Sequence, residues 1–123
     1  MTLKYGEFAP FLRDLNKYLT EAQKYAANEH QSKMIGEYLE HFKTGDMTKH
    51  VESQKHWIQD KGPIIETNIR FIESYLDPLK IRAEFEGFVA VVNKEESQIL
   101  NKLVEGAETT LKYLPWGQQF ECD

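Results

Sequence analysis

The stretch KGPIIETNIRFIESYLDP, residues 61–78, is the least helical part of the chain and decides the fold class. After Pro63 the apolar residues stop recurring at helical intervals and alternate along the chain, which is the pattern of a β-strand. We therefore predict a strand over about residues 64–75. One face of this strand carries the polar residues Glu66, Asn68 and Arg70. The other face carries Ile65, Thr67, Ile69 and Phe71.

Upstream of this strand, apolar residues recur at three- and four-residue steps and predict three helices. Their expected ranges are residues 8–28, 31–43 and 47–59. Pro10 suits the first turn of the first helix, Gly45 the end of the second, and Asp46 the N-cap of the third. The second helix has the clearest inward face, formed by Met34, Ile35, Tyr38, Leu39 and Phe42.

Downstream, the apolar segment EFEGFVAVVN predicts a second strand over residues 84–93. Asn93 and Glu96 form the pattern of a capping box for a last helix over residues 94–114. The expected fold class is therefore α+β and mostly helical: three N-terminal helices, one β-hairpin (about 64–75 and 84–93) and one C-terminal helix (about 94–114).

A hairpin of two strands leaves backbone groups unpaired along both outer edges, and such a sheet is marginal in water. Either helices cover these edges, or further strands come from another stretch of polypeptide. The apolar segment FVAVV, residues 88–92, favours further strands, because so apolar a strand is usually buried on both faces. An uncovered edge predicts dimerisation or aggregation of the chain on its own.

Composition limits the possible functions. The chain of 123 residues has the size of one domain, and its net charge of −5 comes with scattered basic residues, which argues against a nucleic-acid partner. Its longest apolar run is far shorter than the roughly 20 residues of a membrane helix, so no membrane partner is expected. We see no signal peptide, and the single cysteine, Cys122, cannot form an internal disulfide. These features favour the cytoplasm.

No catalytic or metal-binding group emerges from the residues themselves. The four histidines are His30, His41, His50 and His56, and none of them is paired at the spacing that places two ligands on one helix face. Surface positions are the simpler interpretation for all four. Cys122 lies beside the C-terminus without a context that would activate a thiol. Glu84 and Glu86 share a strand face, but nothing else supports an acid–base pair.

The stretch GPIIETNIRFIESYLDP resembles the segment GP-(V/I)-(V/I)-E-(S/T)-Y-I-G-F-I-E-S-Y-R-D-P of the dipeptidyl peptidase III family. EFEGFVAVVNK is similar to the segment that follows it there, and the preceding helices and the later LPW are similar as well. The resemblance therefore covers nearly the whole chain. It implies a zinc exopeptidase that releases dipeptides from the N-termini of peptides, with a β-containing lobe and a helical lobe around a cleft.

The resemblance also implies roles for parts of this chain. Residues 1–92 match part of the β-containing lower lobe with its helices, and residues 93–123 match a helix of the upper lobe. Peptide substrate lies extended along a strand in this family, and Glu66 matches the glutamate that receives the substrate's α-ammonium group. Asn68 stands where the family has a tyrosine, whose hydroxyl the resemblance assigns to the scissile carbonyl or its oxyanion. The zinc ligands of the complete enzyme match no part of this chain, so we expect no cofactor and no catalytic residue here.

Besides Asn68, three positions depart from the family pattern. Arg70 and Ala83 replace glycines, and Leu76 replaces an arginine. Three interpretations remain open. The chain is part of a dipeptidyl peptidase III enzyme completed by the missing remainder or by a partner chain that covers the strand edges. Alternatively, it is an inactive truncated relative that binds peptides or proteins through an exposed strand edge. The third interpretation is a degenerate product without a selected function.

Overall fold

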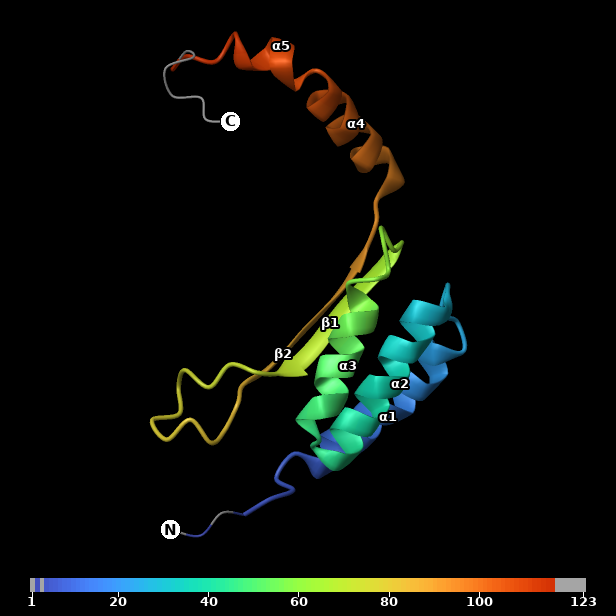
Figure 1. Ribbon diagram of the computed structural model, residues 1–123, viewed down its shortest axis with the longest axis vertical. Helices are drawn as coiled ribbons and strands as arrows, with labels where there is room; N and C mark the ends of the chain where they lie inside the picture. The colour runs from blue at the N-terminus through green and yellow to red at the C-terminus, as the bar shows by residue number, and fades with distance from the viewer. Residues whose placement is uncertain (1, 3, 117–123) are drawn as a thin grey trace. The chain divides into compact units, whose positions relative to one another are not determined.

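The computed structural model describes residue 2 and residues 4–116, and these contain five helices and one two-stranded sheet (Figure 1). In chain order the elements are α1 (Ala9–Gln23), α2 (Glu29–Thr44), α3 (Met47–Trp57), β1 (Ile65–Phe71), β2 (Phe85–Val91), α4 (Lys94–Glu105) and α5 (Ala107–Leu111). The predicted class, α+β and mostly helical with one hairpin, is confirmed.

The chain forms two compact units, Met1–Ala90 and Val91–Asp123. In the first unit α2 packs against both α1 and α3. Figure 1 shows these three helices side by side, with β1 and β2 running next to α3. The second unit holds α4 and α5. The residues of the predicted docking strand therefore all belong to the first unit.

The first helix is shorter than predicted. α1 has Pro10 in its first turn as expected, but it ends at Gln23 instead of residue 28. Asn28 has an extended backbone, and its side chain caps α2 by accepting the N–H of Gln31 at 2.9 Å. A residue that caps one helix in this way cannot continue the helix before it, so the chain turns before Asn28 and α2 begins at Glu29.

The connection between α2 and α3 follows the prediction. Gly45 ends α2 in the left-handed conformation with φ of 77°, and its N–H donates to the carbonyl of His41 at 2.7 Å. Asp46 then caps α3 by accepting the N–H of Thr48 at 2.8 Å. Because only two residues separate the helices, α2 and α3 run antiparallel along each other.

The hydrophobic core lies where α1, α2 and β1 meet. Its buried apolar residues are Leu19, Met34, Ile35, Tyr38, Phe42 and Ile69. Four of these six belong to the predicted inward face of α2, and the fifth member of that face, Leu39, is partly buried against them. α2 is therefore the central helix of the first unit, and β1 reaches the core through Ile69.

The hairpin is shorter than predicted, because β1 stops at Phe71 and β2 spans only Phe85–Val91. Residues 72–84 between the strands form a loop, in which side-chain carboxylates accept several backbone N–H groups. Asp77 accepts the N–H groups of Leu79, Ile81 and Arg82. Backbone N–H groups that donate to a loop carboxylate cannot donate to a neighbouring strand. The hydrogen-bond ladder between β1 and β2 therefore does not extend into this loop.

The two outer edges of the sheet differ. The edge of β1 is covered by α2: Gln31 donates its side-chain N–H to the carbonyl of Ile65 at 3.0 Å, and the N–H of Ile69 donates to the hydroxyl of Tyr38 at 3.4 Å. Of the two alternatives stated above, helix cover therefore applies to the edge of β1, although further strands were favoured. All residues of β2 are exposed, and among residues 4–116 no strand pairs with its other edge.

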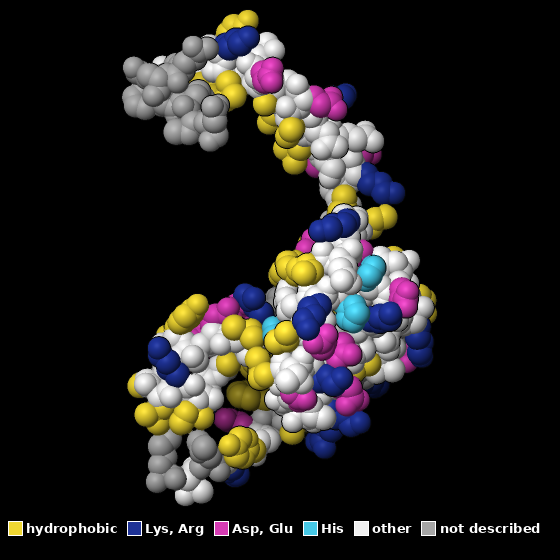
Figure 2. All heavy atoms as spheres, in the orientation of Figure 1, with side chains coloured by type: hydrophobic (Ala, Val, Ile, Leu, Met, Phe, Trp, Pro, Cys, Tyr) yellow, Lys and Arg dark blue, Asp and Glu magenta, His cyan; other side chains and the backbone are white. Residues whose placement is uncertain are grey.

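The predicted last helix is divided at Gly106 into α4 and α5 and ends at Leu111 instead of residue 114. Glycine within a helix is less favourable than alanine by about 1 kcal/mol, which explains a break at this position. Asn93 caps α4 as predicted by accepting the N–H groups of Glu95 and Glu96. α4 has no buried residue, and Figure 2 shows its apolar side chains gathered along one side.

Among the helices that the structure describes, none has the length and apolar character that crossing a bilayer requires.

Candidate functional site

The candidate site is β1, and its first polar residue is Glu66. The side chain of Glu66 is half-buried. Its carboxylate makes no hydrogen bond or ion pair with another residue in the part of the chain that the structure describes. Glu66 is preceded by Ile65, and the carbonyl of Ile65 accepts a hydrogen bond from the side chain of Gln31 on α2. The backbone beside this carboxylate is therefore anchored to a helix, while the carboxylate itself remains available for a cation.

Asn68, the second predicted site residue, lies against α3. Its side chain is 8% exposed, and its amide donates to Oε1 of Gln54 at 2.9 Å. The Oδ1 atom of Asn68 is buried and has no hydrogen-bond partner among the described residues. An unpaired buried carbonyl costs free energy, so this oxygen makes the position of Asn68 against α3 less favourable. The sequence alternation placed Asn68 beside Glu66, but it did not reveal the contact with Gln54.

Arg70, the third polar residue of the strand, is held by two carboxylates. Its Nε donates to Oε1 of Glu86 on β2, and its Nη2 forms an ion pair with Glu73 at 3.2 Å. The hydrogen bond to Glu86 raises the pKa of Arg70. This cross-strand pair contributes to the pairing of β1 with β2. The arginine that replaces a family glycine thus has two local partners within the hairpin and its loop.

The suggested carboxylate pair, Glu84 and Glu86, has structural partners instead of an acid–base arrangement. Glu86 bonds to Arg70, and Oε1 of Glu84 accepts the N–H of Leu76 at 3.1 Å. Each carboxylate therefore stabilises the hairpin or its loop.

The structure brings the four histidines together in two pairs that sequence spacing did not reveal. The ring centroids of His41 and His50 lie 5.4 Å apart, and those of His30 and His56 lie 6.4 Å apart. Each pair joins α2 to α3. Spacing along one helix cannot detect such pairs, because they arise between antiparallel helices. For His41 and His50 the signal that could have found the pair is the short Gly45–Asp46 connection, because each histidine lies four residues from its end of that connection.

Neither histidine pair completes a metal site. Within the described residues, no three side chains of His, Cys, Asp or Glu are grouped so that they could hold an ion. A catalytic zinc needs three protein ligands, so the residues present do not fit the zinc that the family resemblance implies. Cys122 lies outside the described residues.

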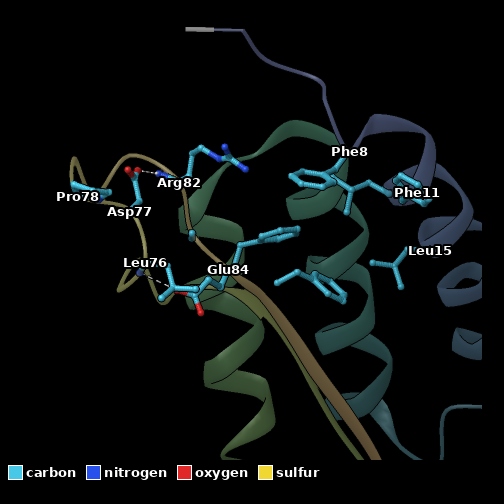
Figure 3. A pocket seen from close by; sticks show the side chains of 12 residues that line it. Phe8, Phe11, Leu15, Leu76, Asp77, Pro78, Arg82 and Glu84 are labelled. Atoms are coloured by element: carbon cyan, nitrogen blue, oxygen red, sulfur yellow. Dashed lines mark hydrogen bonds between the residues drawn. The ribbon is translucent and has the colours of Figure 1, made fainter.

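An apolar groove opens at the end of the hairpin, and the sequence patterns did not predict it. It has a volume of about 930 Å³ and lies between α1 and the loop of residues 72–84. Figure 3 shows Phe8, Phe11 and Leu15 on the helix side, and Leu76 and Pro78 on the loop side. Most of these side chains are exposed. The groove is therefore an apolar surface that no described residue fills.

The loop wall of the groove is shaped by the carboxylate of Asp77. It accepts the N–H groups of Leu79 at 3.2 Å, Ile81 at 2.8 Å and Arg82 at 2.7 Å. The backbone hydrogen bonds from Arg82 and Ile81 hold the pKa of Asp77 below its ordinary value. The sequence predicts a turn around Asp77 and Pro78, but only the structure shows that the Asp77 carboxylate accepts three backbone N–H groups.

Replacing Asp77 with alanine should loosen this loop. We expect hydrogen exchange at the amides of Ile81 and Arg82 to accelerate by about tenfold or more, because both lose a charged acceptor. Asp14→Ala on the exposed side of α1 is the matched control and should leave these two amides unchanged. Equal exchange rates in Asp77→Ala and the unmodified chain would show that the loop is held by other contacts.

Comparison with known proteins places the chain in a family. The model of "Peptidase family M49" matches residues 1–123. Dipeptidyl peptidase 3 of Homo sapiens is 51% identical over 118 residues, which are 96% of this chain and 16% of the human protein. The Dictyostelium discoideum protein of the same name is 45% identical over 121 residues, or 98% of this chain and 18% of that protein. The chain is therefore a member of peptidase family M49.

The fold comparison agrees. The solved structure of DPP III from Caldithrix abyssi superposes with a TM-score of 0.62 at 29% identity, over 94% of this chain and 22% of that one. The predicted resemblance to dipeptidyl peptidase III is confirmed. The chain spans less than a fifth of the length of its curated relatives, at 16% of the human protein and 18% of the Dictyostelium protein. Since it matches a segment of a larger enzyme, an independent binding module is not the favoured interpretation.

Proposed function

We propose that this chain supplies the substrate-docking strand of a zinc-dependent dipeptidyl peptidase, which releases dipeptides from the free N-termini of peptides. The observation that carries the proposal is the match to peptidase family M49 over residues 1–123, with curated relatives named dipeptidyl peptidase 3. β1 is the proposed docking strand. Its backbone is anchored to α2, and it presents Glu66 with an unpaired carboxylate.

In this proposal Glu66 receives the α-ammonium group of the substrate. An enzyme that removes two residues must hold the N-terminus at a fixed distance from the bond that is cut. A carboxylate does this through charge-assisted hydrogen bonds worth about 1.5–3 kcal/mol. The interaction also excludes peptides with a blocked N-terminus, because acetylation removes the cation.

Asn68 is proposed as a second substrate-binding residue, at the position of the family tyrosine. Its amide nitrogen carries two hydrogens and donates one of them to Gln54, so the other is the donor for a substrate carbonyl, directly or through a water molecule. The unpaired Oδ1 of Asn68 is buried, so a peptide backbone reaches it only after Asn68 moves away from α3.

The remaining parts of the enzyme are proposed to come from the rest of a longer polypeptide. Residues 1–92 would belong to a β-containing lower lobe and residues 93–123 to a helical upper lobe. The remainder would supply the zinc ligands and cover the exposed edge of β2 and the apolar groove. The exposed apolar residues of β2 and α4 support such a cover. We propose the cytoplasm as the compartment, in line with the single cysteine.

Glu66→Gln tests the proposed amine-binding role in a protein of the relatives' length that contains this segment. We expect kcat/KM for a peptide with a free N-terminus to fall about 10- to 100-fold, because the charge-assisted contact is lost. Cleavage of the N-acetylated peptide should stay at its low level, so the preference for a free N-terminus collapses.

Glu105→Gln in α4 removes the same charge and should leave both rates unchanged. If the unmodified enzyme already cleaves acetylated and free peptides equally well, Glu66 does not bind the ammonium group.

A further inference from the structure

His41 and His50 form a buried pair between α2 and α3. Their side chains are 4% and 5% exposed, and the His41 ring also lies 5.0 Å from the ring of Phe42. The centroid separation of 5.4 Å between the two imidazoles means that two positive charges cannot be accommodated there without strong repulsion. In the folded chain at most one of the two rings can readily carry a proton charge.

Hydrogen bonding distinguishes the two rings. Nδ1 of His41 lies 2.9 Å from the backbone carbonyl of Asp46, and since a carbonyl only accepts, this nitrogen carries a hydrogen. Nδ1 of His50 is buried and has no partner among the described residues. An imidazolium must donate from both nitrogens, so a charged His50 would leave a buried N–H unsatisfied. The geometry therefore favours neutral His50.

Two basic groups near His50, His41 and Arg70, act in the same direction, and the neighbouring carboxylates have partners of their own. On the α2 side it faces His41, and Glu37 of α2 is already paired with Lys49 of α3 at 3.1 Å. On the β1 side the nearest cation is Arg70, which is partly neutralised by Glu73 and Glu86. At the turn, the carboxylate of Asp46 lies near His41 and bonds to Thr48. Burial first, and then His41 and Arg70, lower the pKa of His50.

His50 is also close to the contacts that hold β1 on the helices. The hydroxyl of Ser53 donates to the His50 carbonyl at 2.6 Å, and Gln54 follows on the next turn of α3. Gln54 accepts from Asn68 and donates to the hydroxyl of Tyr38, which in turn accepts from the N–H of Ile69. A displacement of α3 at His50 would therefore disturb the hydrogen bonds that attach β1.

We propose that the His41–His50 pair is an acid-sensitive contact between α2 and α3. When His50 is protonated, the attachment of β1 to these two helices becomes weaker. Any effect on peptide binding rests on the proposed function, in which β1 is the docking strand. Its test does not depend on that role, because it measures the attachment of the strand and not catalysis.

The expected pH window follows from the direction of the pKa shift. Above about pH 6.5, the ordinary histidine pKa, His50 is neutral in the closed and the opened states, and the attachment has its full strength. Below that value the opened state binds a proton that the closed state resists. Opening then becomes more favourable by up to about tenfold per pH unit for one proton, until the lowered pKa of the closed state is passed.

Amide hydrogen exchange of the 123-residue chain measures this opening. After correction for the intrinsic exchange rate, we expect the opening constant of the Ile69 amide to rise severalfold between pH 7.0 and 5.5. His50→Gln keeps a polar side chain but cannot be protonated, so its opening constant should not change with pH. His30→Gln removes a histidine from the more exposed pair and should retain the pH dependence of the unmodified chain.

Two results would overturn the proposal. One is an opening constant of the Ile69 amide that stays constant over this pH range, or that changes equally in His50→Gln. The other comes from an NMR titration of the imidazole protons in the unmodified chain, which remains informative if a variant does not fold. His50 should stay neutral below about pH 6.5 while the fold is intact. Protonation of His50 at its ordinary pKa with the fold intact would exclude the proposal.

Discussion

Replacement of Tyr38 with alanine is expected to lower the free energy of unfolding by about 3–5 kcal/mol, as for other large aromatic side chains removed from a core. Tyr38 is 0% exposed and packs against the ring of Phe42 with centroids 6.0 Å apart. Its hydroxyl also accepts the Ile69 N–H that anchors β1. Domains of this size have total stabilities of about 5–15 kcal/mol, so the variant should be largely destabilised. Urea unfolding followed by circular dichroism measures the change.

Two control variants separate packing from hydrogen bonding at this position. Tyr38→Phe keeps the ring but leaves the Ile69 N–H without its acceptor, and should cost about 1–3 kcal/mol. Tyr18→Ala removes a tyrosine that is 69% exposed on α1 and should change stability by no more than about 0.5 kcal/mol. Similar losses for Tyr18→Ala and Tyr38→Ala would show that Tyr38 is not the centre of the core.

The second large effect concerns activity. We expect the 123-residue chain by itself to release no dipeptides and to bind no stoichiometric zinc. A catalytic zinc needs three converging protein ligands. The histidines of the described residues form two separate pairs, and no third ligand lies close enough to either pair to complete a metal site. Zinc content after dialysis can be measured by mass spectrometry, and dipeptide release from a short peptide by chromatography.

A contaminating peptidase is the main risk in this experiment. Glu66→Gln, purified in parallel, serves as the control, because activity from a contaminant would be the same in both preparations. Dipeptide release that requires zinc, and that is lower in Glu66→Gln than in the unmodified chain, would contradict the prediction and place a complete site in this segment.

Local signals predicted the parts of the fold that depend on neighbouring residues. Gly45, Asp46 and Asn93 end or begin helices as their residue types suggest, because a cap involves atoms only a few positions apart. Helix boundaries were predicted less well where a second preference competed. Asn28 caps α2 instead of extending α1, and Gly106 interrupts the predicted last helix.

The strand that carries the candidate site was predicted, but the surroundings of its side chains were not. Alternation along residues 64–72 and the family resemblance selected Glu66 and Asn68, and β1 carries both. The burial of Asn68 and its bond to Gln54 were not predictable from alternation, because they depend on where α3 packs. The same is true of the groove beside α1, whose loop wall depends on three backbone donors that converge on Asp77.

The sequence by itself determined the order of helices and strands up to α4, the caps at Gly45, Asp46 and Asn93, the central apolar face of α2 and the membership in peptidase family M49. These features depend on residue types and on spacings of a few positions, and both can be read from the sequence. Only the tertiary structure decided that α2 covers the edge of β1 and that His41 meets His50. The hydrogen bonds that attach β1 to the helices join residues 14 to 34 positions apart. Such contacts form only when packed helices and strands bring distant residues together, so no local pattern records them.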